Sequence, residues 1–264
     1  MKLGLEGKRA LVTGSTAGIG FAAALGLARE GARVVLNGRS EARVAAARER
    51  LLAAEPGAEV ETVAADLSTA AGAARVTAAV PEVGILVNNV GVFEPKPFEQ
   101  IPDEDWLRFF ETNVMSGVRL CRFYFPKMLA ANAGRIVFVS SESAVQIPVE
   151  MIHYGMTKTA QLAVARGLAE SVAGSGVTVN SILAGPTRSE GVSGFVGDLA
   201  AQKGVSEAQV EKEFFETIRP SSLIKRFAST EEVASLVVYM ASERSSATTG
   251  AALRVDGGVV RSIL

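Results

Sequence analysis

The chain alternates between short apolar runs and longer segments in which apolar residues recur at helical spacing. Apolar runs of about four to eight residues, bounded by glycine or polar residues, are typical of strands buried on both faces of a parallel sheet. The pattern predicts strands at residues 9–13, 33–37, 60–65, 85–88, 135–140, 177–183 and 252–255.

Segments rich in Ala, Leu, Glu and Arg separate these strands, and their periodicity predicts helices. Strands that alternate with helices need right-handed crossovers, which place helices on both faces of the sheet. The sequence therefore predicts an α/β fold, a doubly wound parallel sheet whose ligand crevice lies beyond the carboxyl ends of the strands. The helices are expected at residues 18–30, 41–54, 69–80, 103–131, 152–174 and 230–242.

Residues 187–227 break this alternation, since they are too many for an ordinary connection. One helix is expected within them, at 207–218. The whole segment also contains apolar residues, which include Val196, Phe214 and Phe215. The segment is either a mobile substrate lid or an apolar surface that packs at an oligomer interface or caps the core. We expect a single Rossmann-fold domain over residues 1–264, with the lid at about 187–227.

Composition and charge narrow the classes of partner. The chain has 264 residues, 48% of them hydrophobic, and 27 Lys and Arg against 28 Asp and Glu. Without a long run of like charge, neither nucleic acid nor a membrane is an expected partner, and a small neutral or modestly charged substrate is favoured. The lone Cys121 and His153 exclude an internal disulfide framework and suggest no metal site. A reducing, cytoplasmic location is expected.

A glycine-rich turn, Thr13-Gly14-Ser15-Thr16-Ala17-Gly18-Ile19-Gly20, follows the first predicted strand. Gly14 permits a tight turn, Gly18 lets a pyrophosphate approach the backbone, and Gly20 allows the helix to pack closely on the strand. The exposed N–H groups at the start of the helix then face the anion. This spacing is not G-x-G-x-x-G, and taken alone it also fits a purely structural turn.

Further motifs follow in order: Asn88-Asn89-Val90-Gly91, Asn113, Ser140-Ser141, Tyr154-Gly-Met-Thr-Lys158 and Val255-Asp256-Gly257-Gly258. Together with the glycine-rich turn, they resemble the short-chain dehydrogenase/reductase family over residues 5–258. The resemblance implies seven strands in the order 3-2-1-4-5-6-7 and a homotetramer that uses the helices at 103–131 and 152–174. It also implies cofactor contacts from Gly14, Ser15, Thr16, Gly18, Ile19, Gly20, Arg39, Asp66, Leu67, Asn89, Gly91, Tyr154, Lys158, Gly185, Thr187 and Ser189.

Tyr154 and Lys158 are four residues apart on a predicted helix, so their side chains project from the same face. A free phenol is a poor base at neutral pH, but an adjacent ammonium favours the phenolate, so we expect the pKa of Tyr154 to be lowered. An ordinary solvated helix face is the alternative. His153 is also a candidate acid or base, although neighbouring helix residues point in different directions.

The resemblance assigns roles to these residues. Tyr154 becomes the catalytic acid/base and Ser141 orients the substrate carbonyl. Asn113 kinks its helix, and its freed backbone carbonyl holds a water that relays protons to Lys158. It also implies that Asp66 binds the adenine and Ser189 the carboxamide. The plainer alternatives are a turn hydroxyl for Ser141, a surface helix residue for Asn113 and a helix N-terminal residue for Asp66.

Residues at the end of the second predicted strand bear on cofactor choice. In NAD-preferring relatives, an acidic residue at the position of Gly38 binds the ribose hydroxyls and repels a 2′-phosphate. Gly38 removes that repulsion, and Arg39 supplies a guanidinium that suits a phosphate. NADP(H) is therefore expected, with NAD(H) possible because Ala17 is not basic. A solvated Arg39 at the start of a helix is the alternative.

These observations predict an NADP(H)-dependent oxidoreductase that interconverts a carbonyl and a secondary alcohol. One alternative is a 3-oxoacyl-thioester reductase, which needs a basic patch for an acyl carrier protein, with Arg119, Arg122 and Lys127 as candidates. The other is a nucleotide-sensing protein without turnover. Substrate choice is expected to depend on residues 187–227 and 142–151, which contain no recognisable motif.

Overall fold

The computed structural model, which describes residues 2–263 apart from the side chain of Phe195, is built around one seven-stranded sheet. The strand order is β3-β2-β1-β4-β5-β6-β7 and all neighbouring strands are parallel, which confirms the predicted fold class. The strands are β1 (Arg9–Val12), β2 (Arg33–Gly38), β3 (Val60–Ala64), β4 (Ile85–Asn88), β5 (Gly134–Ser141), β6 (Val177–Ala184) and β7 (Ala252–Val255).

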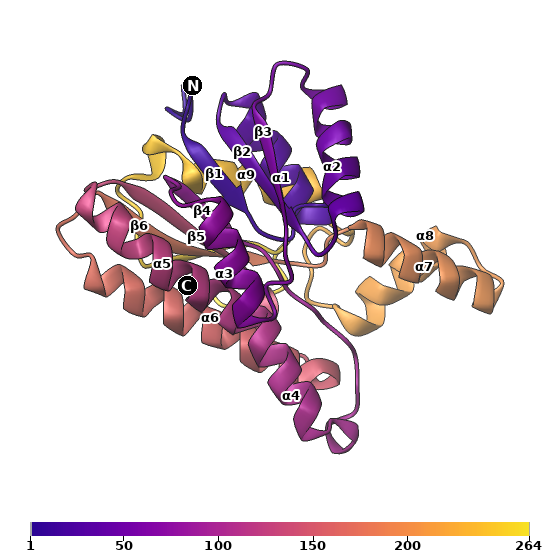
Figure 1. Cartoon of the computed structure of the whole chain (residues 1–264). Coiled ribbons are helices and arrows are strands. Elements are labelled where there is room, and N and C mark those ends of the chain that lie inside the picture. Colours follow the sequence, from indigo (N-terminus) through magenta and orange to yellow (C-terminus); the bar gives the residue numbers. More distant parts are fainter. Residues whose placement is uncertain (1, 264) are drawn as a thin grey trace.

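Helices cover both faces of this sheet (Figure 1). One face packs against α1, α2 and α9, and the other packs against α3, α5 and α6. The described helices are α1 (Gly18–Arg29), α2 (Glu41–Ala54), α3 (Ala70–Ala79), α4 (Asp103–Phe110), α5 (Ser116–Ala130), α6 (Ile152–Ser171), α7 (Glu190–Lys203), α8 (Glu207–Glu213) and α9 (Thr230–Ala241).

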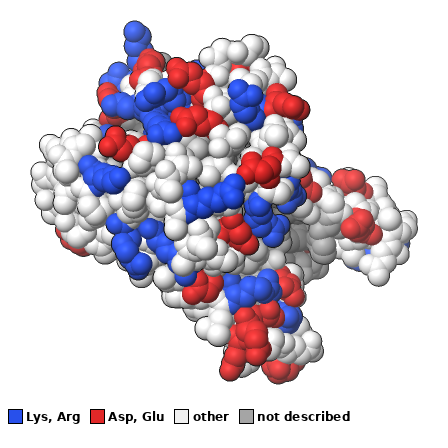
Figure 2. Space-filling model, viewed as in Figure 1, with Lys and Arg blue, Asp and Glu red and all other residues white. Residues whose placement is uncertain are grey.

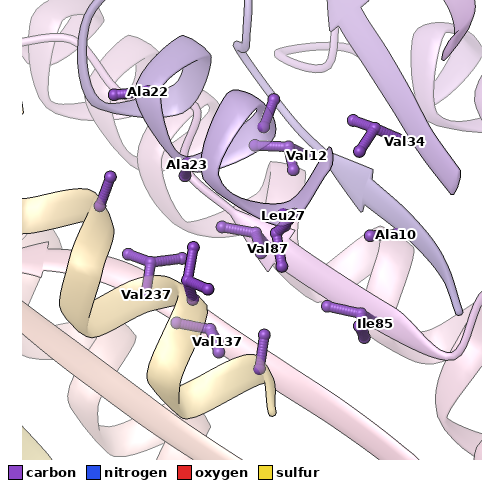
Figure 3. Packing of buried hydrophobic residues seen from close by; sticks show 14 of the residues in the cluster. Ala10, Val12, Ala22, Ala23, Leu27, Val34, Ile85, Val87, Val137 and Val237 are labelled. Carbon is purple, nitrogen blue, oxygen red and sulfur yellow. The ribbon is translucent and has the colours of Figure 1, made fainter. Parts of the chain in front are cut away.

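Small and branched side chains let α1 and α9 approach the middle of the sheet. Ala23 and Leu27 of α1 lie against Val12 and Val87 of the central strands, beside Val237 of α9 (Figure 3). Each of these five residues is fully buried. Close packing of this kind fixes the end of β1, and therefore the glycine-rich turn that follows it.

The predicted helix over residues 103–131 is divided into two. Between α4 and α5 the chain forms a π-helical turn, Glu111–Met115, which contains Asn113. A π-helical turn inserts one residue into the helical hydrogen-bond pattern and frees a backbone carbonyl. The resemblance implied an asparagine that kinks its helix at this position, and the π-helical turn is the break it implied.

Residues 187–227 contain two helices where one was expected. The predicted helix at 207–218 corresponds to α8 and a π-helical turn, Phe214–Ile218, whereas α7 was missed. Three glycines within α7 obscure its helical pattern, because glycine is a poor helix former. The ends of α7 carry the signals that identify it: Ser189 caps its first turn, and Gly204 ends it with a φ of 66°.

The helices α7 and α8 project from the body of the molecule (Figure 1) and have a small core of their own. Val196, Val210, Phe215 and Phe227 are buried against one another in this core. These four side chains face inward, whereas Leu223 of the same segment is 81% exposed, so the lid and the apolar interface or cap both stay predictions. We refer to residues 187–227 as the lid.

His153 is completely buried where α4 packs on α6. Its ring centre lies 4.1 Å from that of Phe109 and 6.0 Å from that of Trp106, and neither ring nitrogen has a hydrogen-bond partner within residues 2–263. Burial lowers the pKa of His153, an effect that Asp105 and Glu94 oppose and that Lys96 and Arg108 reinforce. The imidazole is therefore a neutral part of the core.

This burial makes stability depend on pH in a specific window. Because the pKa of His153 is lower in the folded chain, the unfolded chain binds more protons below about pH 6.5, and the free energy of unfolding decreases as the pH falls. We expect urea unfolding at about pH 7, 6 and 5 to reveal this loss, and we expect His153→Leu to remove it. His153 is the only histidine, and the carboxyl groups with lowered pKa titrate below this window. An equal loss in the variant would contradict the assignment.

Candidate active site

The predicted catalytic residues meet at the carboxyl edge of the sheet. Ser141 ends β5, and the first two turns of α6 carry Tyr154 and Lys158. The Lys158 Nζ lies 5.6 Å from the centre of the Tyr154 ring, so both side chains share one site, as their spacing predicted. The exposed ring of Phe93 meets the Tyr154 ring edge-on, with centres 6.3 Å apart.

The predicted lowering of the Tyr154 pKa is wrong. Burial raises this pKa well above its usual value of about 10, although a hydrogen bond with Ser141 acts in the opposite direction. Lys158 does not offset the burial, because its ammonium donates to the carbonyl oxygen of Val139 at 3.0 Å and to Oε1 of Gln161 at 3.3 Å. Burial lowers the pKa of Lys158 itself to about 8.

Asn113 is fixed by three hydrogen bonds of its side chain. Its amide nitrogen donates to the Val92 carbonyl and to the Thr157 hydroxyl, while its amide oxygen accepts from the Val92 N–H. Its freed backbone carbonyl accepts a 2.6 Å hydrogen bond from Nε2 of Gln161. Since Gln161 also accepts from Lys158, its side chain directly connects Asn113 with Lys158.

Gln161 was not among the residues predicted from the sequence, and the water expected at the Asn113 carbonyl stays a prediction. The available signal was its spacing, since Gln161 follows Lys158 by three residues and therefore lies on the same face of α6. A buried amide with both ends hydrogen-bonded fixes the position of the ammonium.

The glycine-rich turn fits the pyrophosphate of a dinucleotide. A Cβ at Gly20 would lie 2.4 Å from the amide nitrogen of Asn89 and 2.5 Å from the carbonyl oxygen of Gly14, so only glycine fits there. Gly14 and Gly18 have φ values of 60° and 56°, which also favour glycine. No side chain caps the start of α1, where Ala17 is the N-cap residue, so its first N–H groups can bind an anion.

Two residues predicted to bind the cofactor hold this turn in place. The Ser15 hydroxyl donates to the Val12 carbonyl and accepts from the Asn37 N–H, and the Ser15 N–H donates to Asn37 in return. The side-chain amide of Asn89 donates to the carbonyls of Thr13 and Gly14. Both side chains therefore shape the turn from within the fold.

The end of β2 has no room for an acidic side chain. A Cβ at Gly38 would lie 2.4 Å from the methyl carbon of Thr16. The adjacent Arg39 is exposed, and within residues 2–263 its guanidinium takes part in no hydrogen bond or ion pair. Beyond the end of β3, Oδ1 of Asp66 accepts from the N–H and hydroxyl of Ser68, and the neighbouring Leu67 is buried.

The predicted nicotinamide end lies where the lid leaves β6. A Cβ at Gly185 would lie 2.5 Å from the Asp256 carbonyl oxygen, and the Thr187 hydroxyl donates to the Gly185 carbonyl. The Ser189 hydroxyl caps α7 and faces the glycine-rich turn, since a Cβ at Gly18 would lie 3.4 Å from its Cβ. A Cβ at Gly91 would lie equally close to the Lys158 ammonium. The structure thus brings the predicted site residues to one edge of the sheet.

A buried ion cluster beside Ser141 was missed by sequence reasoning. Oε2 of Glu142 accepts from the Ser141 hydroxyl at 2.5 Å, and Oε1 accepts from Nε of Arg219 at 3.2 Å. Arg219 also donates to Glu150 at 2.8 Å. Glu142 and Arg219 are 77 residues apart, so no local pattern could have paired them.

Comparison with known proteins places this site in a family. A family model described as enoyl-(acyl carrier protein) reductase matches residues 14–260. The uncharacterized oxidoreductase YvaG of Bacillus subtilis is 47% identical over 263 residues, which cover all of both chains. The D-beta-hydroxybutyrate dehydrogenase of Rhizobium meliloti is 32% identical, over 95% of this chain and 98% of that protein. The chain belongs to the short-chain dehydrogenase/reductase family.

A solved structure of the same family has nearly the same backbone. The L-sorbose reductase of Gluconobacter frateurii, complexed with NADPH and L-sorbose, superposes with a TM-score of 0.93 at 33% identity and full coverage of both chains. This short-chain dehydrogenase/reductase is accordingly an oxidoreductase that acts on CH–OH donors with NAD(P) as acceptor.

The three basic residues of the predicted carrier-protein patch differ in their surroundings, and the patch stays a prediction. Arg122 has no partner within residues 2–263. Arg119 pairs with Glu111, and Lys127 donates to the Pro81 carbonyl and lies over the Phe123 ring. Figure 2 shows acidic side chains gathered at the end formed by α4, and both charges interspersed over the rest of that face. Of the helices in residues 2–263, none has both the length and the apolar character needed to cross a membrane.

Proposed function

We propose that the protein is an NADP(H)-dependent reductase that interconverts a carbonyl and a secondary alcohol. The observation that carries this proposal is the grouping of Ser141, Tyr154 and Lys158 beside a turn that fits a dinucleotide pyrophosphate. A sensor without turnover would not need a phenol, a hydroxyl and an ammonium held together at one site.

In this proposal the bound NADPH supplies a hydride to the substrate carbonyl carbon. Tyr154 gives its phenolic proton to the carbonyl oxygen as negative charge develops there, while Ser141 stabilises that charge. The raised pKa of Tyr154 keeps the phenol protonated, which suits an acid in the direction of reduction. Lys158, with a pKa of about 8, is mostly protonated at neutral pH and can replace the lost proton.

The role of Tyr154 is tested by Tyr154→Phe, which removes one oxygen and leaves the ring. We expect NADPH-dependent turnover to fall by about a hundredfold or more, because proton transfer by a placed side chain contributes roughly 10²- to 10⁴-fold. Cofactor affinity should stay within about twofold. Tyr239→Phe makes the same change on an exposed helix position and should leave turnover unaltered. Substantial residual activity in Tyr154→Phe would overturn the assignment.

NADP(H) is the proposed cofactor because of the residues at the end of β2, where the adenosine ribose is expected to bind. Thr16 leaves no room for an acidic side chain at position 38. The Arg39 guanidinium, which has no partner within residues 2–263, can bind a 2′-phosphate through charge-assisted hydrogen bonds. The NADPH complex of the L-sorbose reductase supports the same choice.

The preference is measured as kcat/KM for NADPH relative to NADH. Charge-assisted hydrogen bonds contribute about 1.5 to 3 kcal/mol, which corresponds to a roughly ten- to hundredfold preference. We expect Arg39→Ala to lose most of it through weaker NADPH binding. Arg122→Ala removes a guanidinium that also lacks a partner in residues 2–263, but on α5, and should keep the preference. Equal values for both cofactors in the unmutated protein would contradict the proposal.

We also propose a homotetramer with α4, α5 and α6 forming one interface. Leu107 and Phe110 of α4 and Leu129 of α5 are exposed apolar residues on these helices, which supports burial against another subunit. Light scattering should give about four times the 27.5 kDa mass of the chain, and Leu107→Asp should dissociate the assembly. A monomer at micromolar concentration in the unmutated protein would rule this out.

A further inference from the structure

The ion cluster beside Ser141 contains two charged groups, Glu142 and Arg219, that have no role in the proposed reaction. Glu142 is 4% exposed and Arg219 is 9% exposed, although charged residues are rarely buried unless they are paired. Glu142 follows the serine at the end of β5, and Arg219 lies in the lid just after the π-helical turn Phe214–Ile218. The hydrogen bonds from Ser141 and Arg219 to Glu142 place both charged groups at the reacting centre, where they also act electrostatically on Tyr154.

The Ser141 hydroxyl has one proton. When a substrate is bound, two oxygens can accept it: Oε2 of Glu142 and the substrate carbonyl oxygen. In the structure this proton is donated to Oε2 of Glu142. To stabilise the charge on a substrate oxygen, Ser141 must donate the same proton to the substrate instead. Glu142 then loses a hydrogen bond while it remains buried, and a buried carboxylate without that donor is costly.

A hydroxyl of the substrate can restore the missing hydrogen bond. Glu142 and the carbonyl oxygen share the same Ser141 hydroxyl, so a hydroxyl on the carbon next to the carbonyl lies close enough to donate to Glu142. Arg219 already occupies Oε1 of Glu142, so Oε2 is the oxygen that receives the new donor.

The charge of the cluster disfavours an anionic group at this position. Two carboxylates, Glu142 and Glu150, surround the single guanidinium of Arg219. A substrate carboxylate in place of the hydroxyl would lie directly beside the Glu142 carboxylate, could not donate to it and would be repelled by it. The substrate class is therefore neutral hydroxy ketones rather than keto acids.

We propose that Glu142, held by Arg219, selects neutral substrates with a hydroxyl on the carbon next to the carbonyl. In the reverse direction the substrate class is a vicinal diol. The inference rests on the proposed reductase function and names the substrate class of the same site. Glu142 is a specificity-determining residue, and Arg219 is a positioning residue that acts through it.

Four-carbon ketones that differ in one group provide the test. The panel is 2-butanone, 3-hydroxy-2-butanone, acetoacetate and the activated 2,3-butanedione, each followed by initial NADPH oxidation. Reduction of the hydroxy ketone moves a hydride from NADPH to its carbonyl carbon and a proton through Tyr154 to its oxygen, which yields 2,3-butanediol and NADP⁺. We expect kcat/KM for 3-hydroxy-2-butanone to exceed that for 2-butanone and for acetoacetate by roughly ten- to hundredfold.

The isosteric variant Glu142→Gln separates recognition by Glu142 from the intrinsic reactivity of the ketones. Its amide oxygen can still accept from Arg219, while its NH₂ group donates to Ser141 and no longer requires the serine proton. We expect the preference for 3-hydroxy-2-butanone over 2-butanone to fall to about threefold or less. A merely structural role of Glu142 would lower all rates together and leave this ratio intact.

Glu150→Gln is the matched control, because it removes the other carboxylate that contacts Arg219 and does not touch Ser141. We expect it to keep the hydroxy-ketone preference. If Glu142→Gln does not fold, the unmutated protein still decides: equal kcat/KM for the hydroxy ketone and 2-butanone, or a preference for acetoacetate, overturns the inference. Reduction of 2,3-butanedione without any hydroxy-ketone preference overturns this inference alone. Silence with all four compounds overturns the proposed function as well.

Discussion

The burial of the Lys158 ammonium at the edge of the sheet is the constraint on which the site depends. A buried ammonium must find acceptors, and this one has the Val139 carbonyl of β5 and the side chain of Gln161. Gln161 in turn needs an acceptor for its own N–H group, and the carbonyl of Asn113 provides it. That carbonyl is free because the helix between α4 and α5 passes through a π-helical turn. One buried charge thus links β5, α6 and the turn between two helices.

Features set by residues close together in the sequence could be predicted, whereas interactions between residues far apart in the sequence could not. Strands appeared as apolar runs because both faces of the sheet are buried, and the pair Tyr154 and Lys158 appeared because helical spacing is local. The pairing of Glu142 with Arg219 could not appear, since it joins the end of a strand to the lid. The pKa of Tyr154 was predicted in the wrong direction because burial depends on tertiary packing, which helical spacing does not reveal.

The glycine-rich turn illustrates a different limit. Motif recognition marks Ser15 and Asn89 as cofactor residues, yet their side chains bond the backbone of the turn itself. A motif records which residues a site requires and does not distinguish groups that contact a ligand from groups that hold the contacting backbone. Gly38 is similar, because Thr16 from the turn covers it and excludes a larger side chain. The residues expected to bind phosphate and those expected to select the cofactor therefore pack directly against one another.

A buried ion pair connects the lid with the reacting centre. As with Lys158, a buried charge requires a partner. Arg219 comes from the lid, whose helices have a small core of their own, and its guanidinium is buried against Glu142 beside the serine. Moving the lid away would leave Glu142 buried without its cation, and an uncompensated buried charge is strongly unfavourable. The lid position is therefore coupled to the charge on Glu142, and through the hydrogen bond between Glu142 and Ser141 it is coupled to the proton that the serine can offer a substrate.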